Sequence, residues 1–119
     1  MSAFHFQADP LESSGRGHVV VPADMKDKAQ LLVFLQRALA LPDYFGQNWD
    51  ALEECLLDFE RLKREPVILV NQDIPLHGKP EDQRLYLQIL ASAALVSDRL
   101  QVIFPDRCRR EIEKILQER

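Results

Sequence analysis

The chain has 119 residues, 46% of them hydrophobic and 29% charged, and its formal net charge at pH 7 is −4. A chain of this length and composition can form a globular domain that buries one core without disulfide or metal staples. No apolar run approaches the roughly 18 residues of a membrane span, and the N-terminus lacks the basic and hydrophobic regions of a secretory signal. We therefore expect one domain over residues 1–119, located in the cytoplasm and without membrane contact.

Hydrophobic patterning predicts strands that alternate with helices along the chain. Strands are expected at 18–21, 66–70 and 100–104, and residues 4–7 are compatible with a further short strand. Helices are expected over about 25–40, 48–62 and 80–97, with a terminal helix within 105–119. Loops are expected over 8–18 and 71–80. The runs at 18–21, 66–70 and 100–104 are continuously apolar, which is typical of parallel strands covered on both faces. Strands separated by helices indicate right-handed crossovers and hence an α/β fold with a small parallel sheet.

Local signals set the expected helix ends and faces. We expect Asp24 to cap the first long helix, with Asp27 three residues on as in a capping box. Pro80 suits the first turn of the third helix. The expected apolar side of that third helix consists of Leu87, Leu90, Ala91, Ala94 and Leu95. The terminal helix has a narrow apolar side at Ile112, Ile115 and Leu116, with which it either packs on the sheet or mediates self-association.

One stretch of the chain concentrates the negative charge. Six of the 19 acidic residues fall between Asp43 and Glu60 without an intervening Lys or Arg, whereas the other 13 face all 15 basic residues. The net negative charge therefore comes from this stretch alone, and it reflects local patterning rather than general acidity.

Projection of the stretch as a helix separates two faces. Asn48 is a good N-cap, and Gly46 before it lets the chain turn. The apolar stripe of the helix contains Ala51, Leu52, Cys55, Leu56 and Phe59. The opposite face contains Asp50, Glu53, Glu54 and Asp58, with Leu57 in their midst.

The acidic face has two interpretations. One is a solvated helix surface without a partner. The other is a docking surface for a basic, concave partner, because no basic residue alternates with the acids and because Leu57 lies among them, flanked by Tyr44, Phe45 and Trp49. The candidate partner-binding residues are Tyr44, Phe45, Gly46, Asn48, Trp49, Asp50, Glu53, Glu54, Leu57 and Asp58.

The segment LPDYFGQNWDALEECL, residues 41–56, resembles the loop and second helix of the barstar family. Members of this family are small intracellular inhibitors of a secreted guanyl-specific ribonuclease. Weaker similarity extends over about residues 19–104, so that 1–17 and 105–119 are additions. The resemblance implies a three-stranded parallel sheet with helices packed around it.

The resemblance also implies a mechanism. Tyr44, Asn48, Asp50 and Glu54 would occupy inhibitor contact positions, with Trp49 and Phe59 nearby. Asp50 and Glu54 would pair with basic residues of a nuclease, and Tyr44 would cover its catalytic histidine.

The sequence departs from the family pattern at several contact positions. Glu54 stands where the best-known member has Asp, Glu53 replaces a Trp, and Trp49 replaces a Leu. On the third helix Ser92 stands where a further acid is expected. These changes preserve an acidic surface, but they leave the identity of the target open.

Other chemistry is weakly represented in the sequence. His5, His18 and His77 lack metal-ligand spacing, no Gly-rich phosphate loop is present, and Cys55 and Cys108 make no disulfide framework. We expect neither a metal nor a cofactor. The arginines of the terminal segment are diluted by glutamates, so direct nucleic-acid binding is not expected.

Three hypotheses follow. The first is a ribonuclease inhibitor of the immunity type, which binds a basic secreted or toxin ribonuclease. The second is a barstar-like module that regulates a basic partner without nuclease activity. The third is an enzyme that uses Asp50 and Glu54 as acid and base, which would require a concave pocket around them. The oligomeric state stays open.

Overall fold

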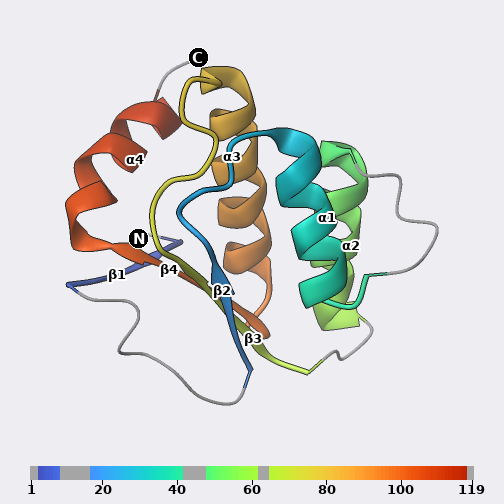
Figure 1. Ribbon diagram of the computed structural model, residues 1–119. Helices are drawn as coiled ribbons and strands as arrows, with labels where there is room; N and C mark the ends of the chain where they lie inside the picture. Colours follow the sequence, from blue (N-terminus) through green and yellow to red (C-terminus); the bar gives the residue numbers. More distant parts are fainter. Residues whose placement is uncertain (1–2, 9–16, 42–47, 62–64, 118–119) are drawn as a thin grey trace.

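The computed structural model describes residues 3–8, 17–41, 48–61 and 65–117. At its centre is a four-stranded parallel sheet with the strand order β1-β4-β3-β2. The strands are β1 (His5–Gln7), β2 (His18–Val21), β3 (Val67–Asn71) and β4 (Leu100–Pro105) (Figure 1). The predicted α/β class with a parallel sheet is confirmed.

The expectation of three strands is wrong, because the run near the N-terminus adds β1 to the edge of the sheet. β1 pairs in parallel with β4, where Phe6 lies opposite Phe104. Phe4, just before the strand, is buried, and its ring centroid lies 5.1 Å from that of Phe104. A three-residue strand has almost no periodicity of its own, and its existence depends on a partner strand about a hundred residues away in the sequence.

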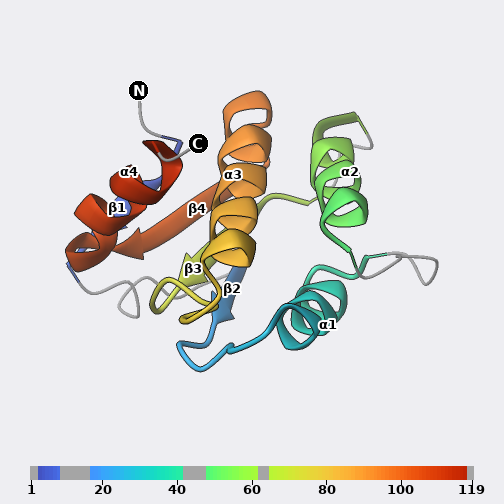
Figure 2. The same cartoon turned by 90° about the horizontal axis from the view of Figure 1, so that it is seen from above.

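Helices cover one face of this sheet. They are α1 (Lys28–Ala38), α2 (Trp49–Arg61), α3 (Pro80–Val96) and α4 (Arg109–Gln117), the last preceded by the 3-10 turn η2 (Asp106–Cys108). Seen from above, α3 lies between α2 and α4 (Figure 2), and it packs against both of them and against β4. α3 is therefore the central helix of the layer.

The sheet separates two sets of buried side chains. Leu69 of β3 and Val102 of β4 are paired in register, and both belong to the large apolar cluster that contains the buried faces of the helices. Val70 and Ile103, one residue further along, are also buried but do not belong to that cluster. Side chains alternate across a strand, so this second pair faces the opposite side of the sheet.

Helix α1 begins later than predicted. Its N-cap is Asp27, not Asp24: the Asp27 side chain accepts a hydrogen bond of 2.8 Å from the Gln30 backbone N–H. Met25 does not start the helix. Its side chain is buried, and its carbonyl accepts the backbone N–H of Leu76 at 2.9 Å, which draws the residues before Asp27 out of the helix.

Buried polar contacts fix α3 on the sheet. The Tyr86 hydroxyl donates a hydrogen bond of 2.7 Å to Asn71 Oδ1 at the end of β3, and both residues are fully buried. Asn71 Nδ2 in turn reaches the carbonyl of Ile103 at 3.4 Å. One turn earlier on α3, the buried Gln83 amide donates to the Pro75 carbonyl at 3.0 Å. These bonds set the rotation of α3 about its axis as well as its position.

This rotation differs from the predicted one. The buried positions of α3 are Gln83, Tyr86, Leu87, Ile89, Leu90 and Ala93. The expectation that Leu95 faces the core is wrong, since it is 63% exposed, and the neighbouring Val96 is 61% exposed. α3 carries apolar residues around most of its circumference, so periodicity alone could not select the face that Tyr86 and Gln83 select.

The terminal helix α4 packs onto the domain. Ile112 is buried, and Ile115 and Leu116 pack against the core, as its narrow apolar side predicts. α4 contacts α3, and the guanidinium of Arg109 lies 4.4 Å from the ring centroid of Phe6 in β1. β1 and α4 therefore complete the same end of the molecule.

We predict that Tyr86→Phe destabilises the fold by about 1–3 kcal/mol, because the fully buried Asn71 amide oxygen loses the hydroxyl that donates to it. Urea unfolding followed by far-UV circular dichroism measures the change. The double variant Asn71→Leu/Tyr86→Phe closes a mutant cycle, and the two substitutions should not be additive. A Tyr86→Phe protein as stable as the wild type would contradict this role for the hydroxyl.

Candidate functional site

The acidic helix α2 starts where the sequence predicts. The Asn48 side chain accepts a hydrogen bond of 2.8 Å from the Ala51 backbone N–H, and its carbonyl accepts that of Leu52 at 3.1 Å. Asp50 lies in the first turn, where the helix dipole favours a carboxylate. The cap fixes the start of the helix and therefore the direction of each later side chain.

The two predicted faces of α2 are present in the structure. Leu52, Leu56 and Phe59 are buried, while Ala51 and Cys55 are half-buried against the core. Phe59 belongs to the core, as its place on the predicted apolar stripe indicates.

The opposite face of α2 points to solvent. Asp50 and Glu54 are exposed, Glu53 and Asp58 are half-buried, and Leu57 is 39% exposed among them. The predicted contact residues Tyr44, Phe45 and Gly46 lie outside the described residues. The described part of the predicted surface is thus a helix face with carboxylates around one exposed leucine.

Trp49 lies in a different place from the one expected. It is only 8% exposed, and its indole N–H donates a hydrogen bond of 3.0 Å to Asp82 Oδ1 in the first turn of α3. Its ring centroid lies 6.3 Å from that of Tyr86. Trp49 supports the acidic face from beneath and joins the N-terminal ends of α2 and α3. The sequence offered no signal for this contact, because Asp82 lies 33 residues further on.

A groove of about 440 Å³ runs between α2 and α3. Asp50 and Glu53 line it on the α2 side, and Gln88 and Ser92 line it on the α3 side. Trp49, Leu85 and Ile89 also line it. Ser92, the residue that stands where the family pattern has an acid, thus faces the same groove as the α2 carboxylates. Glu54 does not line the groove, so Asp50 and Glu54 are not a carboxylate pair enclosed in one pocket.

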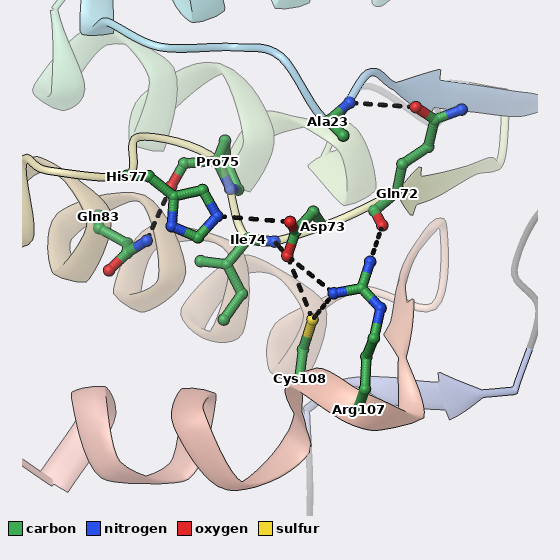
Figure 3. A network of polar contacts seen from close by, with 9 residues as sticks. All are labelled: Ala23, Gln72, Asp73, Ile74, Pro75, His77, Gln83, Arg107 and Cys108. Atoms are coloured by element: carbon green, nitrogen blue, oxygen red, sulfur yellow. Dashed lines mark hydrogen bonds and ion pairs between the residues drawn. The ribbon is translucent and has the colours of Figure 1, made fainter.

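A second polar cluster lies at the carboxyl ends of β3 and β4 (Figure 3). Asp73 Oδ1 accepts the backbone N–H of Ile74 at 2.8 Å and the Arg107 guanidinium at 3.3 Å, and its Oδ2 lies 3.4 Å from His77 Nε2. The Cys108 thiol donates to the same Asp73 Oδ1 at 3.5 Å. No sequence pattern predicts that these residues meet, because they lie on segments far apart in the sequence.

The contacts of this cluster, and the pKa shifts that they cause, indicate a structural role. Cys108 is 2% exposed, and burial, together with the Asp73 carboxylate, raises the pKa of its thiol to about 11, so it is not a nucleophile near neutral pH. Burial alone would raise the pKa of Asp73, but the Ile74 N–H, His77, Arg107 and Cys108 together hold it below its usual range. Arg107 also donates to the Gln72 carbonyl at 3.0 Å, which fastens η2 to the end of β3.

The described residues offer neither a metal-binding cluster nor a membrane-spanning helix. Within residues 3–8, 17–41, 48–61 and 65–117, no three His, Cys, Asp or Glu side chains are placed to hold one metal ion. None of the helices in these ranges is long and apolar enough to cross a membrane.

Comparison with protein families gives one match. The model of the family Barstar (barnase inhibitor) matches residues 18–104, which is most of the chain. The chain belongs to the barstar family. The match begins with β2 and ends in β4, so that β1, η2 and α4 lie outside the barstar region although they pack on it. The search of curated proteins returns no match for the chain.

Membership of the barstar family places the acidic helix in context. The family is described as inhibitors of barnase, and α2 with its groove lies within the matched region. The predicted resemblance over about 19–104 is thereby confirmed. Both helices that bound the groove, α2 and α3, belong to the barstar region, and Leu116 of α4 reaches the groove from outside that region.

We predict that the Asp73 cluster makes stability depend on acid pH. A carboxyl with a lowered pKa in the folded state stabilises the fold above its unfolded pKa of about 4, and this contribution is lost as the pH falls through the folded value. Asp73→Asn should therefore reduce the free energy of unfolding more at pH 7 than at pH 3, in urea titrations at both pH values. An equal loss at the two pH values would mean that the Asp73 charge contributes nothing.

Proposed function

We propose that the chain is an inhibitor of a basic ribonuclease, and that it acts by inserting the acidic face of α2 into the cationic active site of the nuclease. The observation that carries this proposal is the face of a capped helix in the barstar region that presents Asp50 and Glu54 exposed, Glu53 and Asp58 half-buried, and Leu57 among them. The chain is proposed to bind and not to catalyse, within the cytoplasm, as an immunity-type protein.

The electrostatics of a ribonuclease site explain why such a surface inhibits. The site must hold phosphates and stabilise the negative charge that develops on the transferred phosphoryl group, so it presents cations. Carboxylates of α2 placed at the phosphate positions would satisfy those cations, and they offer no bond that the nuclease can cleave. Opposite charge on the two surfaces would also accelerate association.

The geometry argues against the enzyme hypothesis. Acid–base catalysis by Asp50 and Glu54 needs both carboxyls directed at one enclosed substrate. Both side chains are exposed, and only Asp50 lines the groove beside α3. A protruding carboxylate face suits a concave partner better than a small substrate.

The departures at Glu53, Glu54 and Ser92 bear on the target. Affinity depends on both surfaces, so a changed inhibitor surface selects a changed partner. We expect the chain to inhibit a ribonuclease of the organism that makes it, or of a competitor, more tightly than it inhibits barnase.

Titration of nuclease activity tests the proposal. The chain is added to barnase and to basic ribonucleases purified from culture medium, and RNA cleavage is followed. For the cognate nuclease, cleavage should cease at a one-to-one ratio. Asp50→Asn/Glu54→Gln should weaken binding at least roughly 30-fold, since the loss of one desolvated charge partner typically costs about 2 kcal/mol or more.

A matched variant controls for net charge. Asp24→Asn/Glu65→Gln removes the same two charges from exposed positions outside α2, and it should bind like the wild type. If both double variants bind equally well, the acidic face is a solvated surface. Capture of a basic protein without nuclease activity, lost only in the α2 variant, would move the function to regulation.

A further inference from the structure

The outer surface of α3 continues the candidate site beyond the acidic helix. The groove beside α2 is lined in part by Ala91 of α3 and Leu116 of α4. The same two residues also line a second groove of about 440 Å³ on the other side of α3. The two grooves are therefore adjoining parts of one surface. This surface crosses α3, the helix that lies between α2 and α4 in Figure 2.

The second groove is mainly apolar. Its lining includes Phe4 and Phe6 from the β1 segment, Leu95 of α3 and Ile112 of α4. Leu95 is 63% exposed, and Val96 beside it is 61% exposed, the two highest values among the large apolar residues exposed in the described ranges. Exposed apolar side chains that cluster beside a polar surface are typical of protein contact sites.

The outward stripe of α3 carries no charge. It contains Leu85, Gln88, Ala91, Ser92 and Leu95, and the exposed Val96 follows Leu95 at the end of α3. The surface is thus acidic at Asp50 and Glu53, neutral at Gln88 and Ser92, and apolar towards Leu95, with Glu113 of α4 at the edge of the apolar part. A partner that fits all of it must present basic side chains beside an uncharged, apolar patch.

The size of a stable interface also calls for this larger surface. α2 has 13 residues, so its exposed face is a strip of about 20 Å by 10 Å, whereas each partner in a standard complex buries about 800 Å². A partner seated on α2 must therefore contact neighbouring elements, and α3 is the helix packed directly against α2.

We propose that the basic partner of α2 also docks on the apolar surface formed by Leu95 and Leu116, with the exposed Val96 next to Leu95 at the end of α3, so that α3 and α4 contribute part of its binding energy. This inference rests on the proposed function. Charge favours the basic partner over a second copy of the chain, because the chain itself has a net charge of −4 and the α2 part of the surface is acidic. The α4 part lies outside the matched barstar region, so it is a feature of this chain.

The test uses the wild-type chain and the ribonuclease that it inhibits most tightly in the titration above, with binding measured by calorimetry at low and high salt. Leu95→Gln/Val96→Gln removes the apolar surface without changing the charge. Both residues are more than 60% exposed, so thermal unfolding should shift little. The expected result is binding weakened about tenfold, with the same salt dependence as the wild type.

Two comparison variants separate the outcomes. Val20→Gln changes an exposed valine of β2, far from α4 across the sheet, and should bind like the wild type. Asp50→Asn/Glu54→Gln should bind more weakly and with a shallower salt dependence. The inference is overturned if Leu95→Gln/Val96→Gln binds like the wild type while the acidic variant does not, a result that leaves the proposed function intact.

The remaining outcomes are equally decisive. If the chain self-associates in sedimentation runs, and Leu95→Gln/Val96→Gln abolishes this without changing nuclease affinity, then the apolar surface belongs to a second copy and the inference is wrong. If no ribonuclease binds, or if the acidic variant binds like the wild type, the proposed function fails and the inference fails with it.

Discussion

The hydrogen bond between the Tyr86 hydroxyl and Asn71 Oδ1 is the constraint on which the rest of the arrangement depends. It lies wholly within the core and joins the central helix to the central part of the sheet, at 2.7 Å. A buried amide needs its partner, so α3 cannot rotate without a large free-energy cost. The direction of each outward residue of α3, from Leu85 to Val96, follows from this single bond together with the Gln83 contact.

The acidic helix takes its position from the same layer. The Trp49 ring packs at a tilt against Tyr86, and its indole N–H donates to Asp82, so the start of α2 is held against the start of α3 by a buried aromatic pair and one polar contact. The Asn48 cap then fixes where the helix begins. Asp50 and Glu54 are exposed, yet their placement depends on the packing of Trp49 beneath the helix and on the cap at its start. A rigid support of this kind reduces the ordering cost of binding.

How much the sequence predicted depended on whether the deciding interaction is local. The faces of α2, its Asn48 cap and three of the strands follow from nearest neighbours and periodicity, and they are confirmed. The predicted start of α1 was wrong because Asp24 and Asp27 are equivalent N-cap candidates in the local sequence. The burial of Met25 and its backbone hydrogen bond with Leu76 decide between them. β1, the exposure of Leu95 and the burial of Trp49 all depend on contacts with distant segments, which periodicity cannot detect. Whether the α2 face binds a nuclease is likewise a property of two surfaces, of which the sequence contains one.

The spacing of the acids on α2 has a consequence for the free protein. Asp50 and Glu54 are exposed and one turn apart, and like charges at this spacing repel each other by a few tenths of a kcal/mol. In the unbound molecule this repulsion slightly destabilises the helix, and a cationic partner would offset it. Added salt acts in opposite directions on the two states: it screens the repulsion and strengthens the lone helix, while it weakens attraction between the helix and a basic surface. At low salt, therefore, the repulsion within the free helix is strongest, and association with a basic partner would also be fastest.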